Sequence, residues 1–167
     1  MSKQGNITII GAGLGGIMMA IRAAQRGERV EIYERRPHVD QAYRGQRSFT
    51  LTLSKRGLQA LDEIGLRQAT LPLTTPLRGR LVHNRDGTTV YLPYGTAPDE
   101  QIYLIRRHEM NALLYQKAQQ YPQIRFHFQY RLVRLAKETN DLWFVNGQAA
   151  DALVGPVPAG LVIGGDG

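Results

Sequence analysis

The chain has 167 residues, of which 43% are hydrophobic and 21% are charged, and its formal net charge is +7. This length and composition are typical of a globular protein with one core and room for a small second lobe. Because the sequence contains no cysteine, disulfides, thiolate metal sites and a cysteine nucleophile are excluded.

Arginines are scattered from Arg22 to Arg134 rather than gathered in a block or in a stripe with aromatic residues. This scatter argues against nucleic-acid binding, and an anionic cofactor with an acidic substrate accounts for the positive charge at least as well. No stretch is long and apolar enough to cross a bilayer. Glycines at 11–16 also interrupt the apolar run that a signal peptide would need. We therefore expect a cytoplasmic protein with no membrane segment in this chain.

The first predicted element is a short apolar strand at 6–10, which leads into a glycine-rich loop. Gly11, Gly13 and Gly16 fit the spacing G-x-G-x-x-G. In that motif the first glycine makes a tight turn, the second lets a pyrophosphate approach the backbone, and the third lets a helix pack on the strand. A helix follows and is predicted to end near Gly27. Its N-terminus would offer free N–H groups and a partial positive charge to phosphates.

An acidic residue, Glu34, closes the second predicted strand at 30–34. In a dinucleotide-binding unit, a carboxylate at this distance from the glycine loop accepts hydrogen bonds from the ribose hydroxyls. Arg36 has a competing interpretation, because an arginine there could accept the 2′-phosphate of NADP. The carboxylate at position 34 argues against that, since it repels a phosphate. The strand, loop, helix and acid together predict a dinucleotide site.

Beyond a polar loop at 35–47, the pattern turns largely to strands. The remaining predicted elements are strands at 48–53, 124–128, 132–135, 142–145 and 159–163, a hairpin of 80–83 with 88–92, and helices from Ser54 to Gly65 and from Arg107 to Gln120. The expected members of a parallel, Rossmann-like sheet, and hence of an α/β fold, are 7–10, 30–34, 124–128 and 161–163. The chain stops just after the last strand, so we expect it to be the front part of a longer protein.

Three motifs resemble those of the flavin-dependent aromatic hydroxylases, the single-component FAD monooxygenases. They are the glycine loop with Glu34-Arg35-Arg36, the segment 44–54, and the terminal 164–167, which is similar to the start of the family's Asp-Gly motif. Within the family, the segments most similar to the kynurenine 3-monooxygenase branch are 47–57, 76–83, 92–95 and 107–111. The resemblance implies an FAD-binding Rossmann-like domain at 1–71 and 106–167, incomplete at its C-terminus. A β-rich insertion at 72–105 would begin the substrate-binding lobe.

By this resemblance, FAD lies extended, with its pyrophosphate over the glycine loop and its adenosine ribose on Glu34. Arg107 would reach the FAD phosphates, and the alternative is a solvated charge at the start of a helix. Asp166 would hold a ribitol hydroxyl, whereas the sequence alone makes it a loop acid. The full set of implied cofactor residues is Gly11, Gly13, Leu14, Gly15, Gly16, Glu34, Arg36, Leu53, Arg107, Leu132 and Asp166.

Arg80 and Tyr94 are the implied substrate residues. A guanidinium binds a carboxylate in a fixed plane, so Arg80 would clamp the carboxylate of L-kynurenine and Tyr94 would add a hydrogen bond. Alternatively, Arg80 is an exposed strand arginine, since Arg78 lies two residues earlier on the same face. The resemblance implies that NADPH reduces the flavin in the full-length protein. A flavin hydroperoxide formed with oxygen would then convert L-kynurenine to 3-hydroxykynurenine.

This chemistry requires no catalytic acid or base from the protein, because the cofactor carries the difficult steps. The sequence offers none: its four histidines lack metal-ligand spacing, and no nucleophile elbow is present. Two other interpretations stay open. The first is another FAD-dependent hydroxylase or oxidoreductase, such as a flavoprotein oxidase or an NAD-dependent reductase. The second is a truncated, non-catalytic module that only binds a nucleotide.

Overall fold

The computed structural model describes residues 6–38, 49–97, 100–149 and 151–166. The chain divides into two compact units. The first unit combines Met1–Gln46 with Asn111–Gly167, and the second unit is Arg47–Met110. Most of the polar loop predicted at 35–47, the first part of the 44–54 motif, and the last glycine of the chain lie outside the described residues.

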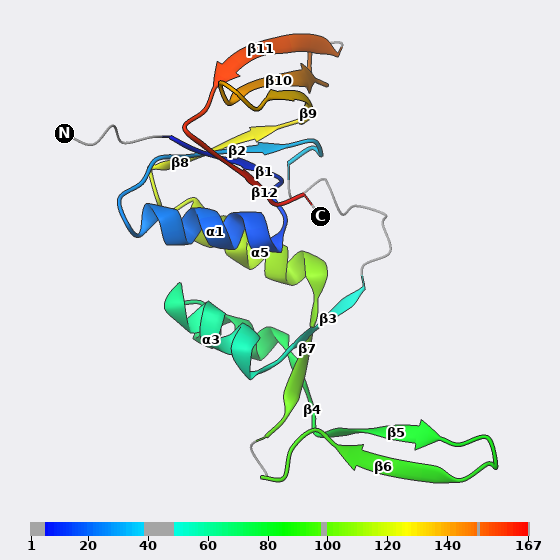
Figure 1. The fold of residues 1–167 in the computed structure, drawn as a ribbon. Helices are drawn as coiled ribbons and strands as arrows, with labels where there is room; N and C mark the ends of the chain where they lie inside the picture. Colours follow the sequence, from blue (N-terminus) through cyan, green and yellow to red (C-terminus); the bar gives the residue numbers. More distant parts are fainter. Residues whose placement is uncertain (1–5, 39–48, 98–99, 150, 167) are drawn as a thin grey trace. The chain divides into compact units, whose positions relative to one another are not determined.

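A four-stranded parallel sheet forms the centre of the first unit (Figure 1). Its order is β12-β1-β2-β8, made of Leu161–Gly164, Ile7–Ile10, Val30–Glu34 and Ile124–Phe128. Every neighbouring pair in this sheet is parallel. The predicted α/β fold with a parallel sheet is therefore confirmed. The apolar strand sequences suit this place, because parallel strands are covered on both faces.

Helices cover one face of this sheet and a second sheet covers the other (Figure 1). On the helical side lie α1 (Leu14–Ala24) and α5 (Arg107–Ala118), whose first four residues belong to the second unit. The α1 helix buries Ile17 and Ile21, one turn apart, and each contributes roughly 1.5–3 kcal/mol relative to an exposed side chain. Tyr115 of α5 meets β8 through Phe126, with ring centroids 4.9 Å apart.

The second sheet of this unit is antiparallel, in the order β11-β10-β9. Its strands are Ala152–Pro158, Asp141–Asn146 and Tyr130–Ala136. Trp143 lies on the middle strand, β10. The guanidinium of Arg134 lies over its indole, 4.4 Å from the ring centroid. A Cβ at Gly155 would lie only 2.7 Å from Trp143 Cδ1, so the absent side chain there is what lets the indole lie against the strand.

A stack of three rings joins the two sheets. Tyr33 on β2 lies between His127 and Phe144, at centroid distances of 4.4 Å and 4.1 Å. Burial raises the pKa of Tyr33, and the neighbouring Glu31 and Tyr130 raise it further, so its hydroxyl stays protonated at neutral pH. His127 Nε2 lies 2.6 Å from a carboxylate oxygen of Glu31, which fixes the outer ring of the stack.

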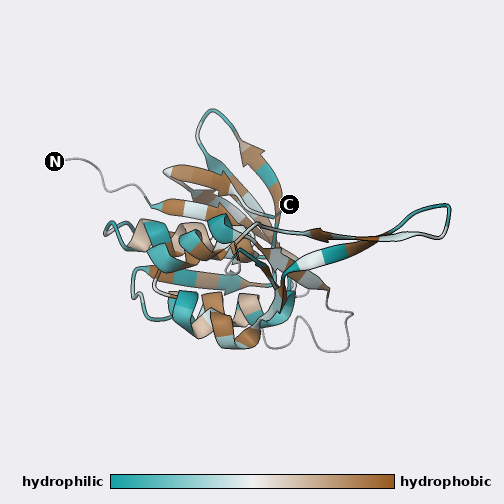
Figure 2. Cartoon of the chain, turned by 90° about the horizontal axis from the view of Figure 1, so that it is seen from below, coloured by the Kyte–Doolittle hydropathy of each residue, from teal (hydrophilic) through white to brown (hydrophobic). Residues whose placement is uncertain are grey.

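In its described residues, the second unit contains a three-stranded antiparallel sheet, three short helices and a hairpin. Its elements are β3 (Thr50–Leu53), α3 (Lys55–Glu63), α4 (Arg67–Thr70), the 3-10 helix η1 (Leu71–Leu73), β4 (Thr75–Leu77), β5 (Gly79–His83), β6 (Thr89–Pro93) and β7 (Ile102–Arg106). The predicted hairpin is present, with Arg80 opposite Leu92. Apolar side chains such as Leu81 and Tyr91 are exposed along it, and Figure 2 shows hydrophobic residues mixed with hydrophilic ones on both strands.

Candidate functional site

The carboxyl ends of three parallel strands meet beside the glycine loop. The N–H of Gly11 donates to the Tyr33 carbonyl at 2.7 Å, and the N–H of Gly165 donates to the Ile10 carbonyl at 2.7 Å. These bonds join the ends of β1, β2 and β12. Because β1 lies between β2 and β12, the connections diverge from it, and ligands of open α/β sheets bind at such a switch point.

Two glycines of the loop are required by close backbone packing. A Cβ at Gly11, whose φ is +103°, would lie 2.8 Å from the backbone of Asp166. A Cβ at Gly16 would overlap the carbonyl oxygen of Gly11, and it would lie 3.4 Å from Ile9 Cγ2. Hence the first and last glycines of the motif let the loop, the helix and the 165–166 segment come together.

The glycines between them are different, because protein atoms do not fill the space beside them. A Cβ at Gly13 would have ordinary contact, 3.6 Å from the Gly165 carbonyl oxygen, and one at Gly15 would meet nothing within 4 Å. Gly13 caps α1 without a side-chain hydrogen bond, and the first turn of α1 holds no acidic residue. The helix therefore begins with free N–H groups beside open space, as a pyrophosphate site requires.

The Glu34 carboxylate is fixed at the end of β2 by two backbone N–H groups. One of its oxygens accepts from Ala12 in the glycine loop and the other from Arg36, both at 2.8 Å. Each carboxylate oxygen has a second lone pair. The carboxylate can therefore accept two further hydrogen bonds, and this fits the pair of hydroxyls on a ribose.

The three residues that follow Glu34 in the chain help to line a cavity of about 410 Å³. Three arginines and a carboxylate give it a net positive lining, and it is formed by Arg35, Arg36, Pro37, Gln129, Arg131, Val145, Gly147 and Asp151. Arg36, one of the cofactor residues implied by the resemblance, is part of this lining. Arg35 and Pro37 are its neighbours in the chain. The other lining residues come from β9, β10, the residue before β9 and the turn after β10, and no local motif in the sequence marked them.

The remaining predicted cofactor residues have separate environments. Asp166 lies at the same strand ends as the glycine loop, because its backbone packs closely against Gly11. Leu132 is half-buried and packs against the core formed by Ile10, Tyr33, Leu142 and Phe144. Leu53 and Arg107 belong to the second unit. A Cβ at Gly57 would lie 3.3 Å from Leu53 Cδ2, and the Arg107 guanidinium lies 5.1 Å from the Phe49 ring centroid. Their roles at a cofactor stay predictions.

Arg80 and Tyr94 lie on one face of the hairpin. Arg80 pairs with Leu92, and the N–H of Tyr94, two residues further on, donates to the Arg78 carbonyl at 2.9 Å. Side chains at such diagonal positions of an antiparallel pair are close enough to hold one ligand. Tyr94 also lines a cavity of about 570 Å³, and Arg80 is not among the described residues that line it.

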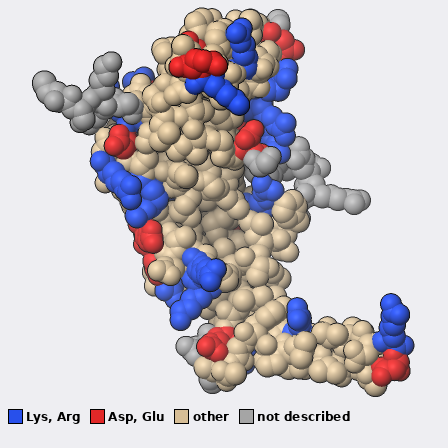
Figure 3. Space-filling view, in the orientation of Figure 1, with Lys and Arg blue, Asp and Glu red and all other residues tan. Residues whose placement is uncertain are grey.

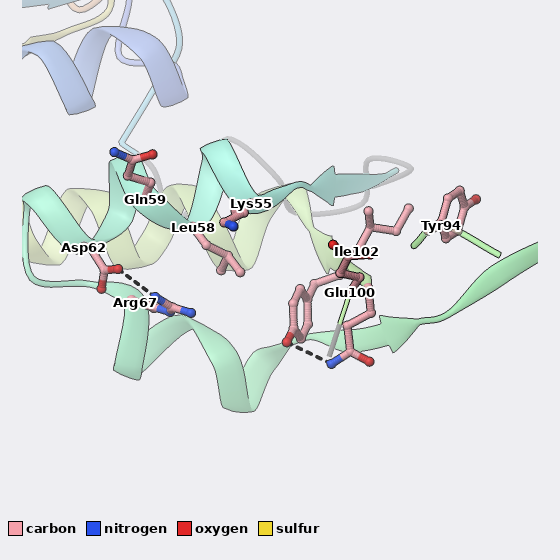
Figure 4. Close-up of a pocket in the computed structure, with 10 residues that line it drawn as sticks. Lys55, Leu58, Gln59, Asp62, Arg67, Tyr94, Glu100 and Ile102 are labelled. Carbon is pink, nitrogen blue, oxygen red and sulfur yellow. Dashed lines mark hydrogen bonds and ion pairs between the residues drawn. The ribbon is translucent and has the colours of Figure 1, made fainter. Parts of the chain in front are cut away.

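This second cavity lies within the second unit, along one face of α3. Figure 4 shows Tyr94 and the ion pair of Asp62 with Arg67 on opposite sides of it. That pair is 2.8 Å long. Glu100 accepts hydrogen bonds from the N–H groups of Ala97 and Thr96, which lower the pKa of its carboxyl and keep it ionised. The lining is thus mixed, with both signs of charge and with apolar side chains between them.

Two absences among the described residues bear on the kind of site. No group of three or more histidine, aspartate or glutamate residues in those ranges is placed to hold a metal ion. In the same part of the chain, no helix combines the length and the apolar character needed to span a bilayer. On the face drawn in Figure 3, basic residues alternate with acidic ones and do not form a single block.

The sequence profile of the family described as "FAD binding domain" matches residues 5–167. The chain belongs to the FAD-binding domain family. The glycine loop, the open helix start and the fixed Glu34 carboxylate are the features of this chain that fit the pyrophosphate and ribose of FAD.

Curated relatives of this FAD-binding domain are kynurenine 3-monooxygenases. The protein of that name from Salinispora arenicola (strain CNS-205) is 36% identical over 167 residues, which cover 99% of this chain and 36% of the relative. The one from Drosophila melanogaster is 33% identical over 166 residues, covering 99% of this chain and 35% of the relative. The predicted resemblance is confirmed. The chain thus spans about a third of the length of these relatives.

Solved structures share the fold. The flavin-dependent monooxygenase PieE, determined with FAD and substrate, superposes with a TM-score of 0.80 at 15% identity, covering 98% of this chain and 30% of that one. The p-nitrophenol 4-monooxygenase PnpA from Pseudomonas putida DLL-E4 gives a TM-score of 0.77 at 14% identity, covering 96% and 40%. The chain thus belongs to the FAD-binding domain family by sequence, and it shares the fold of these solved structures.

Proposed function

We propose that this chain is the FAD-binding portion of an FAD- and NADPH-dependent aromatic monooxygenase that hydroxylates L-kynurenine to 3-hydroxykynurenine. The observation that carries the proposal is the 36% identity to a kynurenine 3-monooxygenase over 99% of the chain, which includes Arg80 and Tyr94. NADPH as the reductant and oxygen as the second substrate belong to the same proposal. The cytoplasmic location expected from the sequence stays a prediction.

The residues of this chain would bind and orient the cofactor and the substrate, and the bound FAD would supply the oxidation chemistry. Free N–H groups at the start of α1 would hold the pyrophosphate, and Glu34 would accept the ribose hydroxyls. Asp166 would accept from the ribitol chain near the same strand ends. On the hairpin, Arg80 would bind the carboxylate of the amino acid, so that the aromatic ring is held in one orientation.

A flavin titration tests the cofactor part of this proposal. FAD added to the purified 167-residue chain should develop a shifted visible absorbance spectrum and co-elute with the protein in gel filtration. NADP should not compete at equal concentration, because the Glu34 carboxylate would repel its 2′-phosphate. A chain that binds NADP and leaves FAD free would identify the site as a nicotinamide site and would reject the proposal.

Arg80→Ala should raise the KM for L-kynurenine about 10- to 100-fold in the full-length protein. The reason is that a charge-assisted hydrogen bond to the substrate carboxylate contributes roughly 1.5–3 kcal/mol. Its bound FAD content should not change. Arg85→Ala, in the turn of the same hairpin, removes an equal charge and serves as the control. An unchanged KM for Arg80→Ala would show that Arg80 is only an exposed strand arginine.

A further inference from the structure

Gln129 has a backbone conformation that side-chain-bearing residues rarely adopt. It lies between β8 and β9 with a φ of 64°. Two hydrogen bonds hold it there: its N–H donates to the Arg36 carbonyl at 3.0 Å, and its carbonyl accepts from the N–H of Gly147 at 2.9 Å. Glycine is the usual residue in this region. A glutamine kept there suggests that its side chain has a use.

The side chain of Gln129 is half-buried and lines the cavity of about 410 Å³ beside Glu34. Within the described residues, its amide has no hydrogen-bond partner. The other polar groups of this lining are of two kinds. The guanidiniums of Arg35, Arg36 and Arg131 can only donate, and the carboxylate of Asp151 can only accept. The Gln129 amide alone offers a donor and an acceptor in one plane.

The order of groups in a dinucleotide says what should enter this cavity. The pyrophosphate is attached at the 5′ carbon of the ribose, and the base is attached next to the 2′-hydroxyl. With phosphates at the start of α1 and the ribose on Glu34, the base extends beyond Glu34, toward the residues that follow it. Those residues, 35–37, form one wall of the cavity, and Gln129 is hydrogen-bonded to that wall.

We propose that the side-chain amide of Gln129 reads the nucleobase of the cofactor and selects adenine over guanine; this rests on the proposed function. The amide oxygen accepts from the 6-amino group of adenine, and the amide N–H donates to the adjacent ring nitrogen. This is the pairing that glutamine makes with the N6 and N7 atoms of adenine elsewhere, whereas arginine prefers guanine, whose corresponding N7 and O6 atoms both accept. The three arginines of the lining would favour guanine, so Gln129 is the residue that makes the site prefer adenine.

Calorimetric titration of the full 167-residue chain with ADP and with GDP tests the proposal. Both nucleotides carry the same ribose and pyrophosphate, so the ratio of their dissociation constants isolates the base. The natural chain should bind ADP at least about tenfold more tightly. In Gln129→Gly this ratio should fall to about one or below. The melting temperature should stay the same or rise, because glycine relaxes the left-handed backbone.

Two further variants complete the test. Gln129→Met keeps the length of the side chain without donor or acceptor, and it too should lose the preference even if Gln129→Gly fails to fold. Asp151→Asn is the matched control: it lines the same cavity with a φ of 60°, and asparagine tolerates that conformation, so the ADP preference should persist.

Three results would overturn the inference. Equal affinity of the natural chain for ADP and GDP, with FAD still bound, would reject base reading and leave the proposed function standing. A preference that survives in both Gln129 variants would assign the selection to other residues. A chain that binds neither FAD nor either nucleotide would reject both this inference and the proposed function.

Discussion

Gly16→Ala should destabilise the first unit by about 3 kcal/mol, measured as the free energy of unfolding in urea. The methyl group would overlap the carbonyl oxygen of Gly11, which is backbone and cannot move aside as a flexible side chain would. To make room, α1 must shift away from β1 and from the 165–166 segment. The same shift would open the site where the three strands end.

Gly15→Ala is the matched control, one residue away on the same helix turn. Its methyl group meets nothing within 4 Å, so the free energy of unfolding should be unchanged or higher by up to about 1 kcal/mol, since alanine favours a helix. The same variant should nevertheless weaken the binding of FAD, because the FAD phosphates are proposed to occupy that open space. Equal stability losses for the two variants would contradict the packing argument.

Glu34→Ala should weaken FAD binding about 10- to 100-fold, measured by flavin absorbance or fluorescence titration. Hydrogen bonds to a charged group contribute roughly 1.5–3 kcal/mol each. The substitution removes the proposed hydrogen bonds to the ribose and also the hydrogen bonds that fix the loop. The N–H groups of Ala12 and Arg36 also lose their acceptor.

Two controls separate these contributions. Glu34→Gln keeps the length of the side chain and one acceptor oxygen, so its affinity should lie between those of the natural chain and Glu34→Ala. Glu138→Ala, an exposed acid in the turn before β10, changes the net charge equally and should leave FAD binding unaltered. If Glu34→Ala bound FAD as the natural chain does, the ribose would have to lie elsewhere.

The parallel sheet could be predicted from sequence because each strand is a short apolar run bounded by glycine or polar residues. Three strands, β4, β7 and β11, were not predicted as separate elements. In β11, Gly155 and Pro156 argue against a strand. The structure tolerates them because β11 lies at the edge of its sheet, where a missing N–H costs little. β4 is three residues long, too short for an alternating pattern to stand out.

The candidate site divides in the same way between local and non-local signals. The glycine loop and Glu34 form a contiguous motif whose geometry follows from one strand, one turn and one helix. The cavity beyond Glu34 depends on the register of β8 against β2, on the turn that joins β8 to β9 and on the turn that joins β10 to β11. A residue such as Gln129 carries no pattern in the sequence, and only its backbone angle and its neighbours distinguish it.

The chain contains a single tryptophan, and it is Trp143, held between Arg134 and Gly155 in the first unit. Intrinsic fluorescence excited at the indole therefore reports the unfolding of that unit alone, whereas far-ultraviolet circular dichroism reports both units. Recording the two signals on one sample measures whether the units unfold together. Coincident transitions mean one cooperative protein, and separated transitions give each unit its own stability.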